Sequence, residues 1–454
     1  MPARTMLLSL SASDPNSNKS QLRKSLDAEF VQIGVPALFS LAAEPVAAIA
    51  DAIFVAKLGT TAQAALGIAL SSQMAVSKLY NDPLLKTSTS IVAGKEGVDL
   101  EESVASALTT AIAIGLIQTL IFYTLAPRIL NLMGVSFTSE MMKPAVSYLK
   151  WKSLGVPAAT LILVSNGIFR GRGDTRTPLY CTVISTILKV FLDPLLIFGL
   201  EMGCAGAGVA SAAAQWCVLI PLLIRLNSRV RIRIFGRTHK FYAAAVTSYL
   251  HAGTLLLLST VSKIWVYSFT SAMAAKMGTV EMAAYSVTYS IAFAGSQLCE
   301  AISIASQVLL ARNFPFNTPA RVNAARRVIL RSISIGVVIS AVLGTVTTLL
   351  QAQILNTLTR STEVYAAAAV VMPAVIATQV FKGLGYSMVG IILGGSDWLW
   401  SSLGSQLSAA LCVGIVAALP PSLWNIWLGL TVLMATQVTI VNNINKFLTF
   451  CLKL

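Results

Sequence analysis

Long apolar segments, separated by short polar breaks, fill the chain from residue 30 to residue 450. About 20 apolar residues are enough to cross a bilayer as a helix, and a spanning segment must satisfy its own backbone hydrogen bonds. Twelve such segments follow one another, so the sequence predicts an all-α polytopic membrane protein with twelve transmembrane helices. The expected helices cover residues 30–58, 62–94, 104–127, 143–168, 177–200, 204–226, 242–277, 281–312, 322–352, 362–392, 398–420 and 422–450.

The composition excludes most other classes of protein. Hydrophobic residues make up 56% of the 454 residues and charged residues only 11%, whereas soluble proteins have about 25% charged residues. A disordered chain, a nucleic-acid binder and an ordinary cytosolic enzyme are therefore excluded. The six Cys and two His show no ligand spacing, so neither a metal site nor a disulfide framework is predicted. The GxxxxGK[ST] motif of ATP-driven pumps and the HExxH zinc motif are absent, and no cofactor is expected.

Positive side chains concentrate in every second break between the apolar segments. The formal net charge is +15, from 33 Lys and Arg against 18 Asp and Glu. Because cytoplasmic loops collect Lys and Arg, both termini are expected on the cytoplasmic side, or on the stromal or matrix side of an organelle membrane. The charge excess thus reflects topology and requires no nucleic-acid partner. The positive breaks contain Lys95, Arg170, Arg172, Arg176, Arg225, Arg229, Arg231, Arg233, Arg237, Lys240, Arg312, Arg321, Arg326 and Arg327.

The two halves of the chain resemble each other. AKLGTTAQAALGI aligns with AKMGTVEMAAYSV, which places Gly59 on Gly278, and GIFRGRGD aligns with GIILGGSD, which places Asp174 on Asp397, at a nearly equal offset. Six helices per half is an even number, so the halves run parallel, as in transporters whose substrate site lies between two repeats. The predicted organisation is a tail, which is cytosolic or part of a transit sequence, then a six-helix lobe, a basic linker and a second six-helix lobe. These parts cover residues 1–29, 30–226, 227–241 and 242–450.

Several charged residues fall inside the predicted membrane spans. A charge at the bilayer centre costs about 2.5–3.5 kcal/mol on insertion scales, so such residues pair, bind ions or face a water-filled cavity. The second span carries a stripe that can neutralise itself, and for this stripe and for the acid of the eighth span both a structural and a functional role stay open. The residues are Glu44 and Asp51; Lys78, Asp82 and Lys86; Lys189 and Asp193; and Lys263, Glu300 and Lys382.

Two of these acids are predicted to couple transport to an ion gradient. Asp51 follows two prolines in the first span, and Asp193 directly precedes Pro194. Proline removes a backbone hydrogen bond and permits a kink, so a carboxylate there could change its protonation as the helix bends. The repeat places Asp51 on Thr270 and Asp193 on Val416. The second half therefore lacks both acids.

With these residues in view, the chain resembles a multidrug and toxic compound extrusion (MATE) transporter, most closely the DinF-like branch. The matching stretches are DAIFVAKLGT from Asp51, NGIFRGRGDTRTP at 166–178 and LDPLLIFGLEMGCAGAGVASAAAQ at 192–215. The chain departs from the family pattern at Ala56, where a glycine is expected, and at Val389, where many relatives carry an acid.

The resemblance implies two six-helix lobes around a V-shaped cavity and export of a small organic solute in exchange for protons or Na+. It assigns cation coupling to the residues at the matching positions, Asp51 and Asp193. Glu44, Lys78, Asp82, Lys86 and Glu300 are candidate cavity or substrate residues, and Lys263 and Lys382 favour an organic anion as solute. A monomer in the lipid bilayer is expected, in the plasma membrane or in an organelle membrane such as the plastid envelope, where some plant members lie.

Three other functions are alternatives to transport by antiport. A flippase for lipid-linked precursors belongs to the same wider superfamily, but flippases commonly carry extra helices beyond twelve. A GxGD intramembrane protease is disfavoured because Arg170, Arg172 and Arg176 surround Asp174, which we instead expect to cap its loop or pair with an arginine, like Asp397. A passive channel stays open as an alternative, and uphill transport that follows a pH gradient would exclude it.

Overall fold

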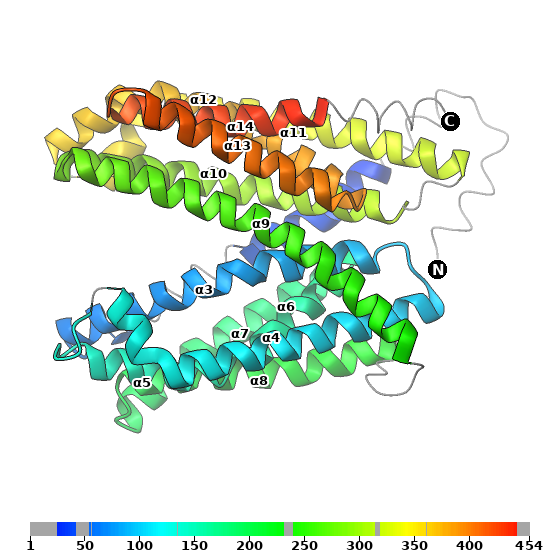
Figure 1. Cartoon of the computed structure of the whole chain (residues 1–454), viewed down its shortest axis with the longest axis horizontal. Coiled ribbons are helices and arrows are strands. Elements are labelled where there is room, and N and C mark those ends of the chain that lie inside the picture. Colours follow the sequence, from blue (N-terminus) through cyan, green and yellow to red (C-terminus); the bar gives the residue numbers. More distant parts are fainter. Residues whose placement is uncertain are drawn as a thin grey trace.

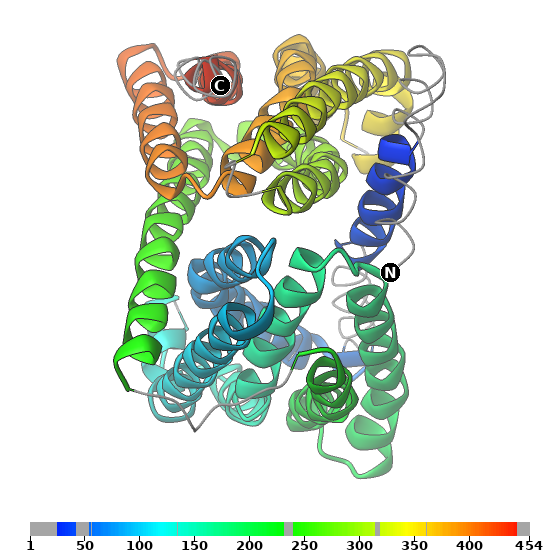
Figure 2. The same cartoon turned by 90° about the vertical axis from the view of Figure 1, so that its right-hand side faces the viewer.

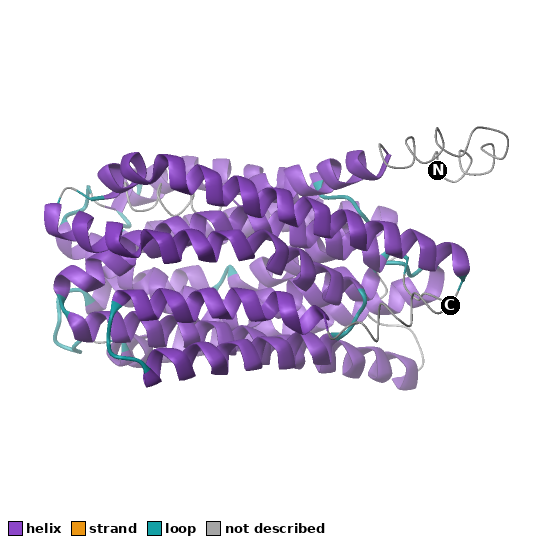
Figure 3. Cartoon of the chain, turned by 90° about the horizontal axis from the view of Figure 1, so that it is seen from above, coloured by secondary structure: helices purple, strands orange, loops and turns teal. Residues whose placement is uncertain are grey.

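The computed structural model describes residues 25–41, 54–55, 57–133, 135–230, 239–313, 318–359 and 361–442. Within these ranges the chain is helical, with short turns between the helices and no strand (Figure 3). The expected all-α membrane fold is therefore confirmed. The first described helix covers residues 25–41.

The N-terminal half continues with five further spans, one of which is broken. The break lies between α5 and α6, which meet at an angle of 51° where the sequence predicts one helix over 143–168. At this junction a Cβ on Gly155 would approach the Ala212 Cα of α8 to 2.6 Å, so the chain passes close to its neighbour there. The elements are α3 (Thr60–Val92), α4 (Gly97–Leu132), α5 (Met142–Ser153), α6 (Val156–Gly171), α7 (Arg176–Pro194), the π-helix η1 (Leu195–Gly199) and α8 (Cys204–Arg229).

The described part of the C-terminal half consists of six unbroken helices. Among the described residues of the whole chain, eight helices are long and apolar enough to cross a membrane, and the bent pair α5–α6 makes a ninth. The helix over 25–41, α3 and α14 bring the arrangement to the expected twelve. The helices are α9 (His239–Met277), α10 (Thr279–Ala311), α11 (Pro319–Leu358), α12 (Thr362–Gly394), α13 (Trp398–Ala418) and α14 (Leu423–Asn442).

The helices gather into two bundles, one formed by α3–α8 and the other by α10–α14 (Figure 1). The first helix of each half packs across this division. Helix α9 runs alongside both bundles (Figure 2) and buries Tyr249 in the apolar core of the N-terminal half. In the same way, the helix over 25–41 buries Phe30, Ile33 and Ala37 against α10 and α11 of the C-terminal half. Two crossing helices therefore connect the bundles.

The internal repeat is visible in the backbone. Gly59 and Gly278, which the sequence aligns, both have a positive φ, 108° and 143°, and directly precede α3 and α10. Gly173 and Ser396 likewise have φ values of 79° and 57° before α7 and α13. Glycine adopts this region without a Cβ penalty. Equivalent turns thus start equivalent helices in both halves.

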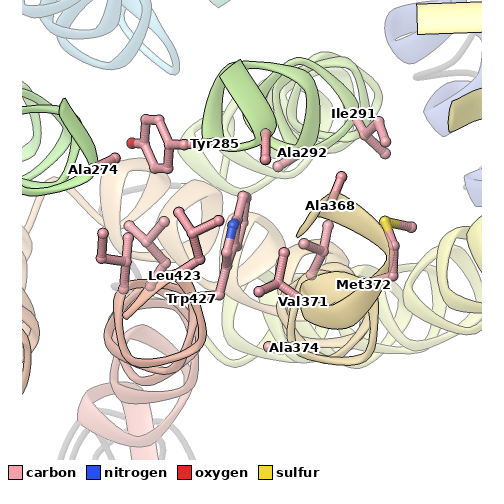
Figure 4. Packing of buried hydrophobic residues seen from close by; sticks show 14 of the residues in the cluster. Ala274, Tyr285, Ile291, Ala292, Ala368, Val371, Met372, Ala374, Leu423 and Trp427 are labelled. Atoms are coloured by element: carbon pink, nitrogen blue, oxygen red, sulfur yellow. The ribbon is translucent and has the colours of Figure 1, made fainter. Parts of the chain in front are cut away.

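The largest core cluster lies in the C-terminal half, between α9, α10, α12 and α14. Trp427 of α14 is fully buried there, and its ring centroid lies 6.3 Å from that of Tyr285 on α10 (Figure 4). Its indole N–H donates a hydrogen bond to the Thr288 hydroxyl, 3.2 Å away. These contacts pack α14 against the face of α10 that carries Tyr285 and Thr288.

Candidate functional site

An ion pair joins the two halves inside the membrane. The Lys86 ammonium of α3 lies 3.2 Å from a Glu300 carboxylate oxygen of α10 and 3.4 Å from Asp82, one turn away on its own helix. Lys263 of α9 lies within electrostatic range of all three side chains. The structure thus brings together four of the predicted cavity residues, and Lys78 lies close enough to interact with Asp82. Within α3, Lys86 pairs with Asp82, as expected for a stripe that neutralises itself. Lys86 also pairs with Glu300 of the other half.

Exposure to solvent increases from Ser90 to Asp82 on α3 and from Glu300 to Phe293 on α10. On α3 Ser90 is 4% exposed, and the side chains of Lys86 and Asp82 are 15% and 59% exposed. On α10 the side chain of Glu300 is 23% exposed, and Phe293 is 43% exposed as a whole residue. The halves therefore touch near the end where α3 and α10 finish, and we call the more exposed region beyond Lys86 and Glu300 the cleft. Asp82 and Phe293 lie in this cleft.

Buried hydrogen bonds close the narrow end of the cleft. The Gln307 amide of α10 donates to the Ser90 hydroxyl at 2.6 Å and to the Lys86 carbonyl at 3.0 Å. The Ser90 hydroxyl in turn donates to the Leu393 carbonyl of α12 at 2.9 Å. We call Lys86, Ser90, Glu300, Gln307 and Leu393 the inner gate. It ties α3 of one half to two helices of the other.

A second layer of contacts lies outside the inner gate. Arg312, which follows α10, lies 3.7 Å from Glu29 of the first described helix. Its guanidinium occupies the space beside Gly173 where a Cβ would lie, since a Cβ there would come within 1.2 Å of it. The Thr175 hydroxyl donates to the Gln32 carbonyl at 3.0 Å. We call Glu29, Gln32, Gly173, Thr175 and Arg312 the outer gate. The sequence shows none of these pairings, because their partners are far apart in the chain.

Arg170 is a buried cation that the sequence assigns to a loop. In the structure it belongs to the last turn of α6, is only 6% exposed and lies within electrostatic range of Glu300. Its Nε and Nη1 atoms have no hydrogen-bond partner in the described part of the chain. Burying a guanidinium without full pairing is costly. Arg170 follows Asn166 by four residues, so it would share the buried face of Asn166 if the helix continued past residue 168. This spacing is the sequence signal that could have placed Arg170 in the helix.

Asp193 is fully buried in α7 and precedes a local widening of the helix. Pro194 ends α7, and the π-helix Leu195–Gly199 follows, in which the Leu200 N–H donates to the Leu195 carbonyl at 3.0 Å. Proline cannot donate the usual backbone hydrogen bond, and π-turns often mark functional positions in helices. The sequence predicts that Pro194 permits a kink beside Asp193, and the structure has a π-helix directly after this proline.

Three other predicted residues are not part of the ion cluster as described. Lys382 of α12 is buried and donates a hydrogen bond to the Ala292 carbonyl of α10. Glu44 and Asp51 lie outside the described residues. The coupling role of Asp51 therefore stays a prediction.

The two aspartates aligned by the repeat cap their helices, as expected. The Asp174 carboxylate accepts from the Thr177 N–H at 2.9 Å, and Asp397 accepts from the Trp400 N–H at 3.2 Å. Asp174 also lies 3.7 Å from Arg229. Burial raises the pKa of Asp397 above its ordinary value. Both aspartates thus have a structural role at helix starts.

Within the described ranges no group of three or more His, Cys, Asp and Glu side chains could hold a metal ion. The chemistry of the site is that of ion pairs, aromatic rings and carboxylates. Such a site can bind a solute and exchange protons or monovalent cations, and it is closed at one end by the two gates.

The MatE family model matches residues 36–195 and 256–419 of the chain. The chain is 28% identical over 425 residues to Protein DETOXIFICATION 44, chloroplastic, of Arabidopsis thaliana, covering 90% of this chain and 80% of that relative. A crystal structure of MATE in the bent conformation has a TM-score of 0.82 at 18% identity and covers 94% of this chain and 96% of that one. A multidrug resistance MATE family transporter in an outward-facing conformation gives 0.78 at 18% identity, with the same two coverages. These solved structures share the fold.

Proposed function

The chain belongs to the MatE family, whose members are membrane transporters, and from this premise we propose that it is an antiporter driven by an ion gradient. It is a multi-pass membrane transporter and not an enzyme. In the proposed cycle a small organic solute leaves while protons or Na+ enter. The two lobes, over 30–226 and 242–450, alternate between openings on the two sides of the membrane.

The observation that carries this proposal is that the described ion pair and hydrogen bonds between α3 and α10 all lie at one end of these helices. The inner gate buries Ser90 and Gln307, whereas Asp82 is open to water two turns away along α3. A rigid pair of bundles with such a one-sided closure can expose the same residues to the other side by rocking. The closed end bears the positive loops, so by the positive-inside rule the described cleft opens away from the cytoplasm, stroma or matrix.

We assign ion coupling to Asp51 and Asp193. Support for Asp193 comes from its complete burial and from the π-helix that follows it. A buried carboxylate is costly to keep charged in the membrane, so its protonation or its pairing with Na+ can favour one helix geometry over another. A proton gradient supplies about 1.4 kcal/mol per pH unit, and the membrane potential supplies about 2.3 kcal/mol per 100 mV.

An organic anion is the proposed class of solute. Among the described residues, Lys86, Lys263 and Arg170 lie around the two carboxylates of Asp82 and Glu300, so this part of the structure carries an excess of positive charge. Such an excess attracts anions and disfavours cations. We further propose a monomer in an organelle membrane, for which the relative named chloroplastic gives support, with the plasma membrane as the alternative.

Transport by the full chain in proteoliposomes tests this function. We expect uphill movement of an organic anion when a pH or Na+ gradient is imposed, and loss of gradient dependence in Asp193→Asn and Asp51→Asn. Asp99→Asn, an exposed acid in the first turn of α4, is the matched control and should keep coupling. Movement only down the solute gradient would indicate a channel. Full coupling in both variants would refute the assigned acids.

A further inference from the structure

A row of aromatic rings lies along one face of α10. The ring centroids of Tyr285 and Tyr289 are 5.9 Å apart and those of Tyr289 and Phe293 are 6.3 Å apart, with interplanar angles of 24° and 23°. Tyr267 of α9 contacts Tyr289 edge-on, at 5.5 Å and 71°. We call these four residues the aromatic row. Offset stacking and edge contacts of this kind are the favourable geometries of aromatic groups.

The aromatic row faces the cleft between the halves. Residues four and seven positions apart share one face of a helix, so Tyr289 and Phe293 lie on the same side of α10 as Glu300. Glu300 contacts Lys86 of the other half, which fixes the direction of that face. Phe293 ends the row on the side of Glu300 and is exposed, whereas Tyr285 at the other end is buried. A flat molecule in the cleft can therefore extend the stack at Phe293.

Lys263 provides a positive charge next to the aromatic row. It lies one turn before Tyr267 on α9 and is partly exposed. Lys86 pairs with both nearby carboxylates, but in the described part of the chain Lys263 makes no ion pair within 4 Å. None of the described carboxylates therefore holds its ammonium group in a direct salt bridge. Ser296, on the α10 face between Phe293 and Glu300, lies beside Tyr386 of α12.

We propose that the aromatic row and Lys263 form a binding subsite for a planar aromatic carboxylate, whose ring stacks on Phe293 and Tyr289 and whose carboxylate binds Lys263. This rests on the proposed function as an exporter of an organic anion and specifies its solute. An aromatic cation could use the ring faces but would be repelled by Lys263 and Lys86. An aliphatic acid could bind Lys263 but would gain nothing from stacking.

Equilibrium binding to the purified full chain in lipid nanodiscs tests this subsite without any mutation. The probe is radiolabelled 2-naphthoate, which combines a flat ring system with one carboxylate. We expect cyclohexanecarboxylate, which has the charge but no aromatic ring, to compete about tenfold more weakly than unlabelled 2-naphthoate. We expect 2-naphthylmethylammonium, which has the ring but the opposite charge, to compete at least as poorly. Equal competition by either compound would overturn the proposal.

Two single variants locate the subsite. Phe293→Leu removes the exposed ring and Lys263→Gln removes the charge, and each should weaken 2-naphthoate binding by about tenfold. Phe191→Leu is the control, because Phe191 is an exposed ring on α7 outside the row, and it should bind 2-naphthoate like the unmodified chain. Unchanged binding in both site variants would place the naphthoate elsewhere and refute the subsite.

The failure of this subsite and the failure of the proposed function are distinguishable. If 2-naphthoate does not bind but another solute is still moved uphill by an ion gradient, the subsite is wrong and the antiport function stands. If no solute follows an imposed gradient, the proposed function itself fails.

Discussion

Lys86 and Glu300 form an ion pair of 3.2 Å that joins α3 of one half to α10 of the other. Both side chains are largely removed from water, and Lys86 also retains Asp82 on its own helix, 3.4 Å away. When the halves separate at this end, Lys86 keeps one carboxylate whereas Glu300 loses its partner. The pair is therefore sensitive to the relative position of the halves, which a pair within one helix is not.

We expect Glu300→Gln to favour opening at the inner gate. Partly buried pairs contribute about 1 kcal/mol, so the buried position Ser90 should be reached about fivefold more often. Labelling of Ser90→Cys by a thiol reagent, in a chain without other cysteines, measures this. Glu363→Gln removes an exposed acid at the start of α12 and should leave the labelling rate unchanged. A slower rate in Glu300→Gln would contradict the role of the pair.

We expect Gly173→Ala to weaken the outer gate. Gly173 has a φ of 79°, and an added Cβ would also displace the Arg312 guanidinium. Gly97→Ala is the matched control, because Gly97 has a φ of 59° with nothing near its Cβ. Both variants should lose about 1 kcal/mol of unfolding free energy from backbone strain. Thermal unfolding should show a further loss only for Gly173→Ala, and this extra loss should vanish when Arg312 is also replaced by Ala.

We expect Arg170→Met to keep or raise stability while it lowers transport. Removing a buried, incompletely paired guanidinium relieves its desolvation cost, and apolar replacements of buried charges are often neutral or stabilising by about 1–4 kcal/mol. The transport rate should fall because the positive charge beside Glu300 is lost. Arg170→Lys, which keeps the charge, should retain more transport. A strongly destabilised Arg170→Met would show instead that the guanidinium is structurally paired.

Asp397 should make stability depend on pH. Its pKa is raised by burial above its ordinary value of 3.8, so the folded state binds more protons than the unfolded state between these two values. The free energy of unfolding should therefore fall as pH rises through this window and level off above the folded pKa. Asp397→Asn keeps an oxygen that can accept from Trp400 and should remove this contribution. An unchanged pH slope in the variant would rule out Asp397 as its source.

The sequence alone determined the twelve helices, their order and the repeat. Lipid leaves the backbone of a long apolar segment few options other than a helix, so composition and length suffice. The capping roles of Asp174 and Asp397 were equally local, because each acceptor lies three residues from its donor. The widened turn after Asp193 follows from the adjacent proline in the same way.

Only the tertiary structure decided which charges meet. Helical periodicity shows that Asp82 and Lys86 share a face, but the rotation and packing of α3 against α10 select Glu300 as the second partner. The same packing buries Arg170 at the contact of the halves and holds Lys382 against a carbonyl, away from the ion cluster. The end at which the halves close also depends on this packing, because side chains far apart in the chain form both gates.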